Sequence, residues 1–518
     1  MNSVADSFTW IDWGVVAAYL VFTTWIGHRL RGKQSTINDF FRAGRSLPWP
    51  AVSASIIATE ISALTFIGVP AMVYAASGNF TYIQWAIGSI IARVLVGIYL
   101  VPRYYKEEIF SPYDYIGGQL GEGAKRITTV LFFLGSVLGQ SVRVLVTALI
   151  LRTVTGVDFE WCIVFIALFA VGWTLMGGMA TVIWTDVVQF FLFLFGGVLA
   201  LVWILAVLPG GVPEWMEVSS GAGKFVFRDL ATDPAVEFTL WVGILAMPFQ
   251  NLAAFGTDQL NAQRMLCCRN IPDARKAIIW SSVSQVVTLL MLLVGSALFA
   301  YYQTFPPSEA LATLFKEDGN TIFPGWITTV LPVGLSGLVL AGAFAAAISS
   351  LDSILTALSQ TTLSLFRKNN GTEAQPDDMK WSRVLVIVWG IILAIFAIGL
   401  DSMRDDVNMV SLAFGMVSYT YGPLLGILFL ALRNQRIHMG ALTAGVLASV
   451  LITLSFRPDI YQIALNLEWC SVADLLEIPW IVDDGKGSWK MAIIYAWMFP
   501  FTCLLTFLFG LIGAGKKS

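Results

Sequence analysis

Long apolar stretches recur along the whole chain, and each has about the 20 residues that a helix needs to cross a bilayer. In lipid, a helix satisfies its backbone hydrogen bonds within one segment, so the pattern predicts an all-α polytopic membrane protein. The stretch at 326–365 is too long for one straight span, and we expect it to include a short outside helix before the span proper. The thirteen predicted spans lie near residues 11–28, 49–76, 80–102, 127–151, 160–178, 182–208, 238–256, 276–303, 326–365, 382–400, 408–432, 437–456 and 490–513.

The composition supports a membrane protein and argues against other classes. Of the 518 residues, 57% are hydrophobic and 13% are charged, whereas soluble domains have about 25% charged residues. The net charge is −3 and no basic patch remains outside the spans, so nucleic-acid binding is not expected. No histidine cluster, HExxH motif or serine–lysine arrangement is present, so an enzyme is not expected either. The N-terminus lacks a basic region before its first apolar stretch, which predicts a first span rather than a cleaved signal peptide.

Lysine and arginine are unevenly distributed between the predicted loops. Of the 31 such residues, 21 lie in segments that are cytoplasmic if the N-terminus is outside, and 8 lie in the opposite segments. Because cytoplasmic loops are enriched in positive charge, we predict a plasma-membrane protein with its N-terminus outside and its C-terminus in the cytoplasm.

Ionisable side chains inside the predicted spans are few. A charged group at the centre of a membrane helix costs about 3 kcal/mol on insertion scales, so such residues usually have a function. Two of them, Arg93 and Asp258, lie where they can reach a cytoplasmic end, whereas the others need partners or water. The six residues are Glu60, Arg93, Arg143, Asp186, Asp258 and Asp352.

The segment GAFAAAISSLDSILTALSQ, at 342–360, carries a polar stripe within an apolar helix. Asp352 and Ser353 follow Ser349 by three and four residues, which places them on its helix face beside Ser350. A hard cation such as sodium takes several oxygen ligands, and serine hydroxyls supply them without full charge. The alternative is that these hydroxyls only bond back to carbonyls one turn earlier.

The segment SASIIATEISALTFIG, at 53–68, favours the ion site. Its middle is polar, with Thr59, Glu60 and Thr65, and a glycine and a proline follow. A helix broken here frees backbone carbonyls, as in the midplane sites of many transporters. Carbonyls at Ala58 and Ile61, together with the serine stripe, would then complete a sodium cage.

Four motifs together resemble the sodium/solute symporter family, whose members transport sugars, proline, pantothenate, sialic acid, monocarboxylates or iodide with sodium. They are NDFFRAGRSLPW (38–49), GGMATVIWTDVVQ (177–189), GTDQLNAQRMLCCRNIPDARKA (256–277) and AAAISSLDS (345–353). The resemblance implies the leucine-transporter-type fold, in which five core helices are repeated in inverted topology. It implies a single membrane transport domain with an extra N-terminal helix and lead-in at 1–48, repeats at 49–208 and 238–432, and two extra helices at 437–518.

The resemblance also implies which residues bind sodium. The principal site would use the carbonyls of Ala58, Ile61 and Ala346 with the hydroxyls of Ser349 and Ser350. A possible second sodium site would use Asp186, Asp352 and Ser353 with Ser349. Position 352 is a serine in some members, and the aspartate here would strengthen that site or make it protonatable. The alternative for Asp186 and Asp352 is a structural ion pair or hydrogen bond.

The substrate residues are less well matched to the sugar-transporting members of the family. By position, the pocket would hold Gln84, Asn251, Gln285, Thr65, Glu60 and Arg143. Arg143 binds a substrate carboxylate, pairs with Glu60 or has another structural role. The pair is possible because the first and third core helices are neighbours in this fold. A pair favours a neutral polyhydroxy solute, and an unpaired arginine favours a small organic anion. Tyr419 and Tyr421 face the cavity or pack as aromatic side chains.

We therefore predict a sodium-coupled symporter that imports a small polar organic solute: a sugar, polyol, sugar acid or small carboxylate. Sodium, the solute and the lipid bilayer are the expected partners, and no obligatory protein partner is evident. Two alternatives stay open. One is proton coupling through Asp186 or Asp352, and the other is a transporter-like solute sensor.

Overall fold

A computed structural model describes residues 8–30, 37–175, 178–366, 378–401, 409–433, 435–483 and 488–516. It contains two compact units, which are taken one at a time below. The first comprises Met1–Ile83, Gln140–Phe227 and Gln263–Val410, and the second comprises Gln84–Gly139, Arg228–Ala262 and Ser411–Ser518. The chain passes between them within α8 (Glu122–Thr155), α13 (Gln259–Met265) and α20 (Met409–Leu432). The predicted domain boundaries follow internal repeats, which is a different criterion, and they stay a prediction.

Most of the predicted spans correspond to long apolar helices. In the described ranges, eight helices are long and apolar enough to cross a membrane, and two bent helix pairs raise this number to ten. Shorter apolar helices at Phe159–Thr174, Val242–Gly256 and Tyr495–Leu511 coincide with the other three predicted spans. The count of thirteen therefore stays a prediction. Residues 176–178 and 408, at the ends of predicted spans, lie outside or at the edge of the described ranges.

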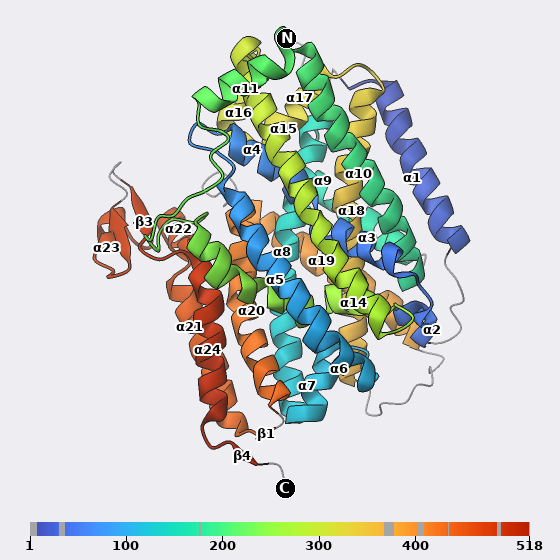
Figure 1. The fold of residues 1–518 in the computed structure, drawn as a ribbon, viewed down its shortest axis with the longest axis vertical. Helices are drawn as coiled ribbons and strands as arrows, with labels where there is room; N and C mark the ends of the chain where they lie inside the picture. The colour runs from blue at the N-terminus through green and yellow to red at the C-terminus, as the bar shows by residue number, and fades with distance from the viewer. Residues whose placement is uncertain are drawn as a thin grey trace. The chain divides into compact units, whose positions relative to one another are not determined.

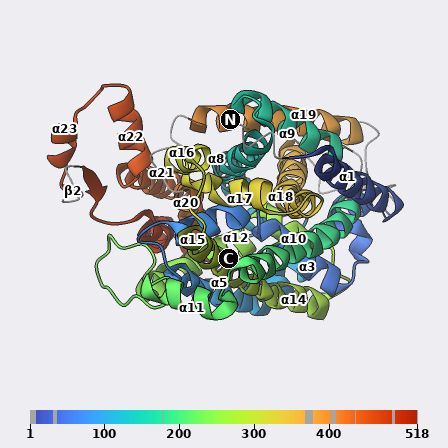
Figure 2. The same cartoon turned by 90° about the horizontal axis from the view of Figure 1, so that it is seen from above.

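The first unit is built around α18 (Leu335–Phe366), which is buried along most of its length, its polar stripe included. α18 packs along α10 (Met179–Val207) and α1 (Trp10–Leu30), and the three helices lie side by side in Figures 1 and 2. Small residues allow this close packing, because a Cβ at Gly342 would lie 3.2 Å from Phe193 Cα. The other helices of this unit are α2 (Ile37–Arg42), α3 (Trp49–Glu60), α4 (Val69–Tyr74), α9 (Phe159–Thr174), α11 (Gly211–Gly221), α14 (Ile271–Trp280), α15 (Ser284–Thr304), α16 (Glu309–Glu317), α17 (Ile322–Val330) and α19 (Asp378–Leu400).

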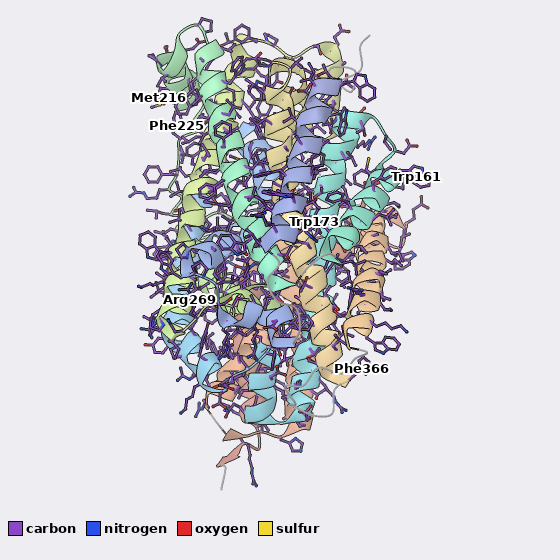
Figure 3. The ribbon with its side chains drawn as sticks, turned by 90° about the vertical axis from the view of Figure 1, so that its right-hand side faces the viewer. Trp161, Trp173, Met216, Phe225, Arg269 and Phe366 are labelled. Atoms are coloured by element: carbon purple, nitrogen blue, oxygen red, sulfur yellow. The ribbon has the colours of Figure 1, made fainter. Side chains whose placement is uncertain are left out.

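Outward-facing side chains of the first unit are apolar and large. Trp161 on α9 is 59% exposed and Phe366 at the end of α18 is 81% exposed, and Figure 3 shows where both lie. Such exposure is unusual for large apolar side chains in water, whereas it suits helices surrounded by lipid.

Two sequence predictions about helix breaks are confirmed in this unit. α3 ends at Glu60, Ile61 is extended (φ −76°, ψ 103°), and α3 and the following helical segment Leu64–Tyr74 are bent by 58°. The long stretch at 326–365 likewise divides into α17 and α18, as expected for a short helix before a span.

Helices of the second unit also pack closely at glycine residues. α21 (Met439–Ser455) packs on α24 (Met498–Leu511), where a Cβ at Gly445 would lie 2.5 Å from Phe509 Cβ (Figure 1). α5 (Trp85–Leu95) packs on α12 (Met247–Gly256) in the same way. The other elements are α6 (Val101–Lys106), α7 (Pro112–Leu120), α22 (Pro458–Asn466), α23 (Val472–Leu476), and the antiparallel pairs β1 (Gln435–Arg436) with β4 (Gly515–Lys516) and β2 (Ile481–Asp483) with β3 (Trp489–Met491).

Candidate functional site

The break after α3 places free carbonyls beside the serines of α18. The last four carbonyls of a helix have no partner within it, and ending α3 at Glu60 leaves those of Ala58 and Thr59 in this position. The Ser349 hydroxyl donates to the Ala58 carbonyl at 2.8 Å, and the Ser350 hydroxyl donates to the Thr59 carbonyl at 3.2 Å. Both serines are fully buried. The structure thus brings together two segments that are far apart in the sequence.

The same hydroxyls also lie near a carbonyl of their own helix. Ser349 Oγ is 3.2 Å and Ser350 Oγ is 3.4 Å from the Ala346 carbonyl oxygen, which is the back-bonding that the alternative reading predicted. A hydroxyl has one hydrogen to donate, yet each of these faces two carbonyl oxygens. A sodium ion at the predicted site would instead accept lone pairs from all of these oxygens at once.

The predicted ligand set and the contacts agree in part. Ala58, Ala346, Ser349 and Ser350 come together as predicted, whereas the contribution of Ile61 stays a prediction. The Ile61 amide donates to the Ile57 carbonyl at 2.9 Å. Sequence reasoning missed the Thr59 carbonyl, although a helix ending at Glu60 would have indicated it.

A second polar cluster lies on the same unit, and a buried arginine is at its centre. Arg264 pairs with Asp186, with Nη2 3.2 Å from Oδ2, and its Nε donates to Ser55 Oγ at 2.9 Å. Ser55 Oγ in turn donates to Asp186 Oδ2 at 2.5 Å. Arg264 also donates to Ser353 Oγ, which lies 3.0 Å from Asp352 Oδ1. The side chains of Asp186, Arg264, Asp352 and Ser353 are all fully buried.

This cluster contains the residues of the predicted second sodium site, with a guanidinium among them. Arg264 contacts both Asp186 and Ser353, so it supplies the positive charge that a second cation would bring. The geometry favours the structural ion pair that was the alternative for Asp186. Sequence reasoning missed Arg264 as a site residue, because it falls between two predicted spans and was assigned to a cytoplasmic segment. Its place in the TDQxxxQR motif was the available signal.

Two carboxylate oxygens of the cluster are left over. Asp186 Oδ1 and Asp352 Oδ2 are buried and accept no hydrogen bond from the described residues. A buried carboxylate oxygen in this state has room for a proton or a cation. These two oxygens are the atoms at which the predicted second sodium site, or the proton of the proton-coupled alternative, would have to be placed.

Four of the predicted substrate residues lie in the first unit near the break, and all four side chains are half-buried. Arg143 Nη1 donates to the Thr59 carbonyl at 2.9 Å. Gln285 Nε2 lies 3.4 Å from Glu60 Oε1. Thr65 lies in the π-helical turn Leu64–Gly68 after the break, and its amide donates to the Ser62 carbonyl. Arg143 and Glu60 thus approach the same broken segment, and their pairing stays a prediction.

The other two predicted substrate residues, Gln84 and Asn251, belong to the second unit and are buried there. Gln84 Nε2 donates to the Phe238 carbonyl at 2.8 Å, and its Oε1 accepts from the Asp229 amide at 3.3 Å. Asn251 Nδ2 donates to the Met247 carbonyl at 2.9 Å. In this conformation both amides stabilise their own unit, and their contact with a solute stays a prediction.

Other polar residues of the second unit also bond within it. The Tyr419 hydroxyl lies 3.1 Å from Asp459 Oδ2, and the Tyr421 hydroxyl donates to Asp258 Oδ2 at 2.6 Å. Arg93 lies over the ring of Phe255 at 4.4 Å. These contacts support structural roles for the two tyrosines in this conformation.

Comparison with known proteins agrees with this geometry. The profile of the sodium:solute symporter family matches residues 40–448. A sodium/sialic acid symporter of Proteus mirabilis is 29% identical, over 87% of this chain and 90% of its own length. A sodium/glucose cotransporter of Vibrio parahaemolyticus is 27% identical, over 88% of this chain and 87% of its own length. The solved structure of a substrate-bound, outward-open Na⁺-coupled sialic acid symporter superposes with a TM-score of 0.81, at 25% identity, over 98% of this chain and 100% of that one.

An all-α polytopic chain with a broken helix beside buried hydroxyl groups is typical of a secondary transporter. The similar proteins show which family of transporters this is. The chain belongs to the sodium:solute symporter family. It is a sodium-coupled membrane transporter and not an enzyme, and the predicted leucine-transporter-type fold is confirmed.

Proposed function

We propose that this chain imports a small polar organic solute together with sodium across the plasma membrane, with the N-terminus outside and the C-terminus in the cytoplasm. The solute class is a sugar, polyol, sugar acid or small carboxylate. The observation that carries the proposal is the meeting of Ser349 and Ser350 with the carbonyls of Ala58 and Thr59 at the helix break. The excess of lysine and arginine in the predicted cytoplasmic loops supports the orientation.

The coupling follows from which elements the ion joins. Sodium at the Ser349–Ser350 site bonds both to the last turn of α3 and to α18, so it stabilises the conformation in which they are together. The adjoining polar side chains, Glu60, Thr65, Arg143 and Gln285, lie on or beside the same broken segment. Sodium binding therefore orders the part of the protein that would hold the solute.

The sodium gradient is sufficient for this work. One sodium ion gains about 2.3 kcal/mol from a potential of 100 mV. A tenfold concentration difference adds about 1.4 kcal/mol. Together these values support a solute gradient of roughly a few hundredfold, since each 1.4 kcal/mol corresponds to a factor of ten.

Acidic sugars are the first solutes to test. Two of the similar proteins, the Proteus mirabilis symporter and the solved outward-open structure, carry sialic acid. Arg143 supports an anionic solute, because a guanidinium binds a carboxylate through two hydrogen bonds. It can do so only by exchanging its bond to the Thr59 carbonyl. Neutral sugars are the next class, and Glu60 with Gln285 would then offer acceptors and donors to hydroxyl groups.

A second sodium ion at Asp186, Asp352 and Ser353 belongs to the proposal only for a conformation in which Arg264 has left Asp186. Within the geometry described, one sodium at the serine site is the better supported stoichiometry.

Uptake by reconstituted proteoliposomes tests the function. Radiolabelled sialic acid, glucuronate, glucose and lactate would be offered under an inward sodium gradient, with potassium as the control. Sodium-dependent accumulation of any one supports symport. Accumulation that follows a proton gradient and ignores sodium would establish the proton-coupled alternative. Sodium-stabilised binding without accumulation of any solute bound would contradict transport and favour a sensor.

A further inference from the structure

The second unit carries a helix, α22, with large apolar side chains exposed on one face. α21 and α22 are bent by 58° relative to one another, with Phe456 and Arg457 between them. α22, α23 and the β2–β3 hairpin then extend sideways from α21, as Figures 1 and 2 both show. The bend angle alone does not set this course, because α3 and Leu64–Tyr74 are bent by the same 58°. The sideways course of the whole segment is what suits a helix lying along the bilayer surface.

One side of α22 holds this small subdomain together. Its Tyr461 and Leu465, four residues apart, pack against a buried cluster formed by Leu475, Ile481 and Met491. The Trp480 indole nitrogen also donates to the Tyr461 hydroxyl at 3.0 Å. This side fixes the orientation of α22 on α23 and the hairpin.

The other side of α22 is an apolar stripe that faces outward. Ile460, Ile463 and Leu467 follow one another at helical spacing and are 37%, 37% and 51% exposed. Trp469, just beyond the helix, is 77% exposed. The only charged residue within α22 is Asp459, which is buried and paired with Arg457. The exposed acidic residues of this subdomain lie elsewhere, at Glu468, Asp474, Glu477 and Asp483.

The preceding helix α21 also exposes large apolar side chains. Leu447 and Leu451, one turn apart on that helix, are 58% and 63% exposed. An exposed leucine pair on a membrane helix contacts acyl chains. The chain therefore enters α22 directly from a helix that has a lipid-facing side.

We propose that α22 and Trp469 form an interfacial anchor that lies in the boundary between lipid headgroups and acyl chains. An apolar stripe on a helix parallel to the surface binds this layer, and tryptophan is enriched at the same depth. No lysine or arginine lies on the stripe, so the anchor binds zwitterionic lipid and does not require anionic headgroups.

The anchor is joined directly to a core helix of its unit. Asp459, at the start of α22, pairs with Arg457 and accepts from the Tyr419 hydroxyl of α20 at 3.1 Å. The Arg457 guanidinium lies against Gly415 of α20, where a Cβ would overlap it. Glycine at this position therefore allows the arginine to dock. Through these contacts α22 holds α20 at a constant depth relative to the bilayer surface.

Site-directed spin labelling tests the anchor in the full chain. Single cysteines at Ile463→Cys and Leu467→Cys would be compared with Glu468→Cys and Asp474→Cys, all in a Cys470→Ser background, in phosphatidylcholine proteoliposomes. The four other native cysteines are buried. Collisions with oxygen report lipid, and collisions with a water-soluble nickel chelate report water. We expect oxygen to exceed nickel accessibility severalfold at 463 and 467, with the opposite order at 468 and 474.

Two results would overturn the anchor. Nickel accessibility at 463 and 467 equal to that at 474 would place the stripe in water. Protection of 463 and 467 from both reagents would show that protein covers the stripe, either a second copy or another chain. Sodium-dependent melting of each labelled variant would be measured first, and a value within two degrees of the parent shows that the fold is kept. The test concerns only the anchor, so its failure leaves the proposed transport function untouched.

Discussion

The Ser349 hydroxyl lies 2.8 Å from the carbonyl oxygen of Ala58, a residue 291 positions earlier in the chain. One partner is a side chain in the middle of a continuous helix, and the other is a backbone group exposed by the end of a broken one. A cation between them would join two helices that no peptide segment joins directly. A sodium ion at the predicted site would therefore link α3 to α18.

Removing the serine hydroxyls is expected to weaken sodium binding. A lost ligand in a buried polar site costs about 1–2 kcal/mol, so Ser349→Ala and Ser350→Ala should each raise the sodium concentration for half-maximal stabilisation about tenfold. The double variant should lose sodium-specific stabilisation altogether. The measurement is the melting temperature as a function of sodium, with potassium at matched ionic strength.

A serine elsewhere on the same helix provides the control. Ser364 bonds only to the Thr361 carbonyl of its own helix, and Ser364→Ala should leave the sodium titration unchanged. Equal sodium responses in the parent and the Ser349→Ala/Ser350→Ala variant would refute the site.

The Asp186–Arg264 pair is expected to be a major source of stability. Breaking a buried pair leaves one charge without compensation and costs about 3–5 kcal/mol. Arg264→Gln should therefore lower the melting temperature strongly, and Asp186→Asn should do so as well. The double variant Asp186→Asn/Arg264→Gln should recover much of the loss, because neither charge is then left alone.

The same three variants also distinguish a structural ion pair from a sodium site at Asp186. If Asp186→Asn shifts the sodium titration more than it lowers the melting temperature without sodium, Asp186 binds sodium and the structural reading fails. Asp114→Asn is a suitable comparison, since its pair with Lys125 is partly exposed and should contribute about 1 kcal/mol or less.

The contact between the serine stripe and the broken helix could be predicted from the sequence because its signals are local. The polar cluster around Thr59 and Glu60, followed by a proline, indicates a broken helix wherever the segment packs. The spacing of Ser349 and Ser350 likewise indicates a polar helix face without knowledge of its neighbours. The two signals are independent of each other, and sodium chemistry then suggests that they meet.

The ion pair could not be predicted in the same way. Arg264 lies in a short polar segment between spans, where local composition predicts a loop in water. Its burial beside Asp186 depends on how α13 packs against α3, α10 and α18, and none of these is adjacent in the chain. The contact of Gln84 with Phe238 could not be predicted for the same reason, because the two residues are 154 positions apart in the chain.

The first helix is expected to be essential to α18, because Asp12 caps it. Asp12 Oδ1 accepts from the amides of Gly334 at 2.7 Å and Gly337 at 3.0 Å, and from the Ser336 hydroxyl at 2.6 Å. Losing an acidic cap costs about 1–2 kcal/mol. Asp12→Ala should lower the melting temperature accordingly, and Asp12→Asn should have a smaller effect because it still accepts hydrogen bonds.

An exposed cap serves as the comparison for Asp12. Asp474 caps the short helix α23 with Ser471, and Asp474→Ala should change stability little. An Asp12→Ala variant as stable as Asp474→Ala would show that α1 is an accessory helix rather than a support for α18.

Lys224 is expected to stabilise the outer half of the broken span, with a pH dependence of defined sign. It is fully buried, and its ammonium donates to the Ala75 carbonyl at 2.5 Å, just beyond α4, over the ring of Phe299. Lys224→Met keeps the apolar stem but leaves buried carbonyls without a donor, which costs about 1–3 kcal/mol. The variant should therefore melt below the parent at neutral pH.

Raising the pH should widen the difference in melting temperature between the parent and Lys224→Met. Burial lowers the pKa of Lys224 below its ordinary value of 10.5, so between the two values the unfolded chain holds a proton that the folded chain has released. The free energy of unfolding of the parent then rises with pH in this interval. Lys224→Met has no titrating group at this position, so its free energy of unfolding lacks this rise. Melting curves of both proteins from pH 7 to 10 measure it. A difference that narrows toward pH 10 would mean that the pKa of Lys224 is raised in the fold, and that carbonyl binding outweighs burial.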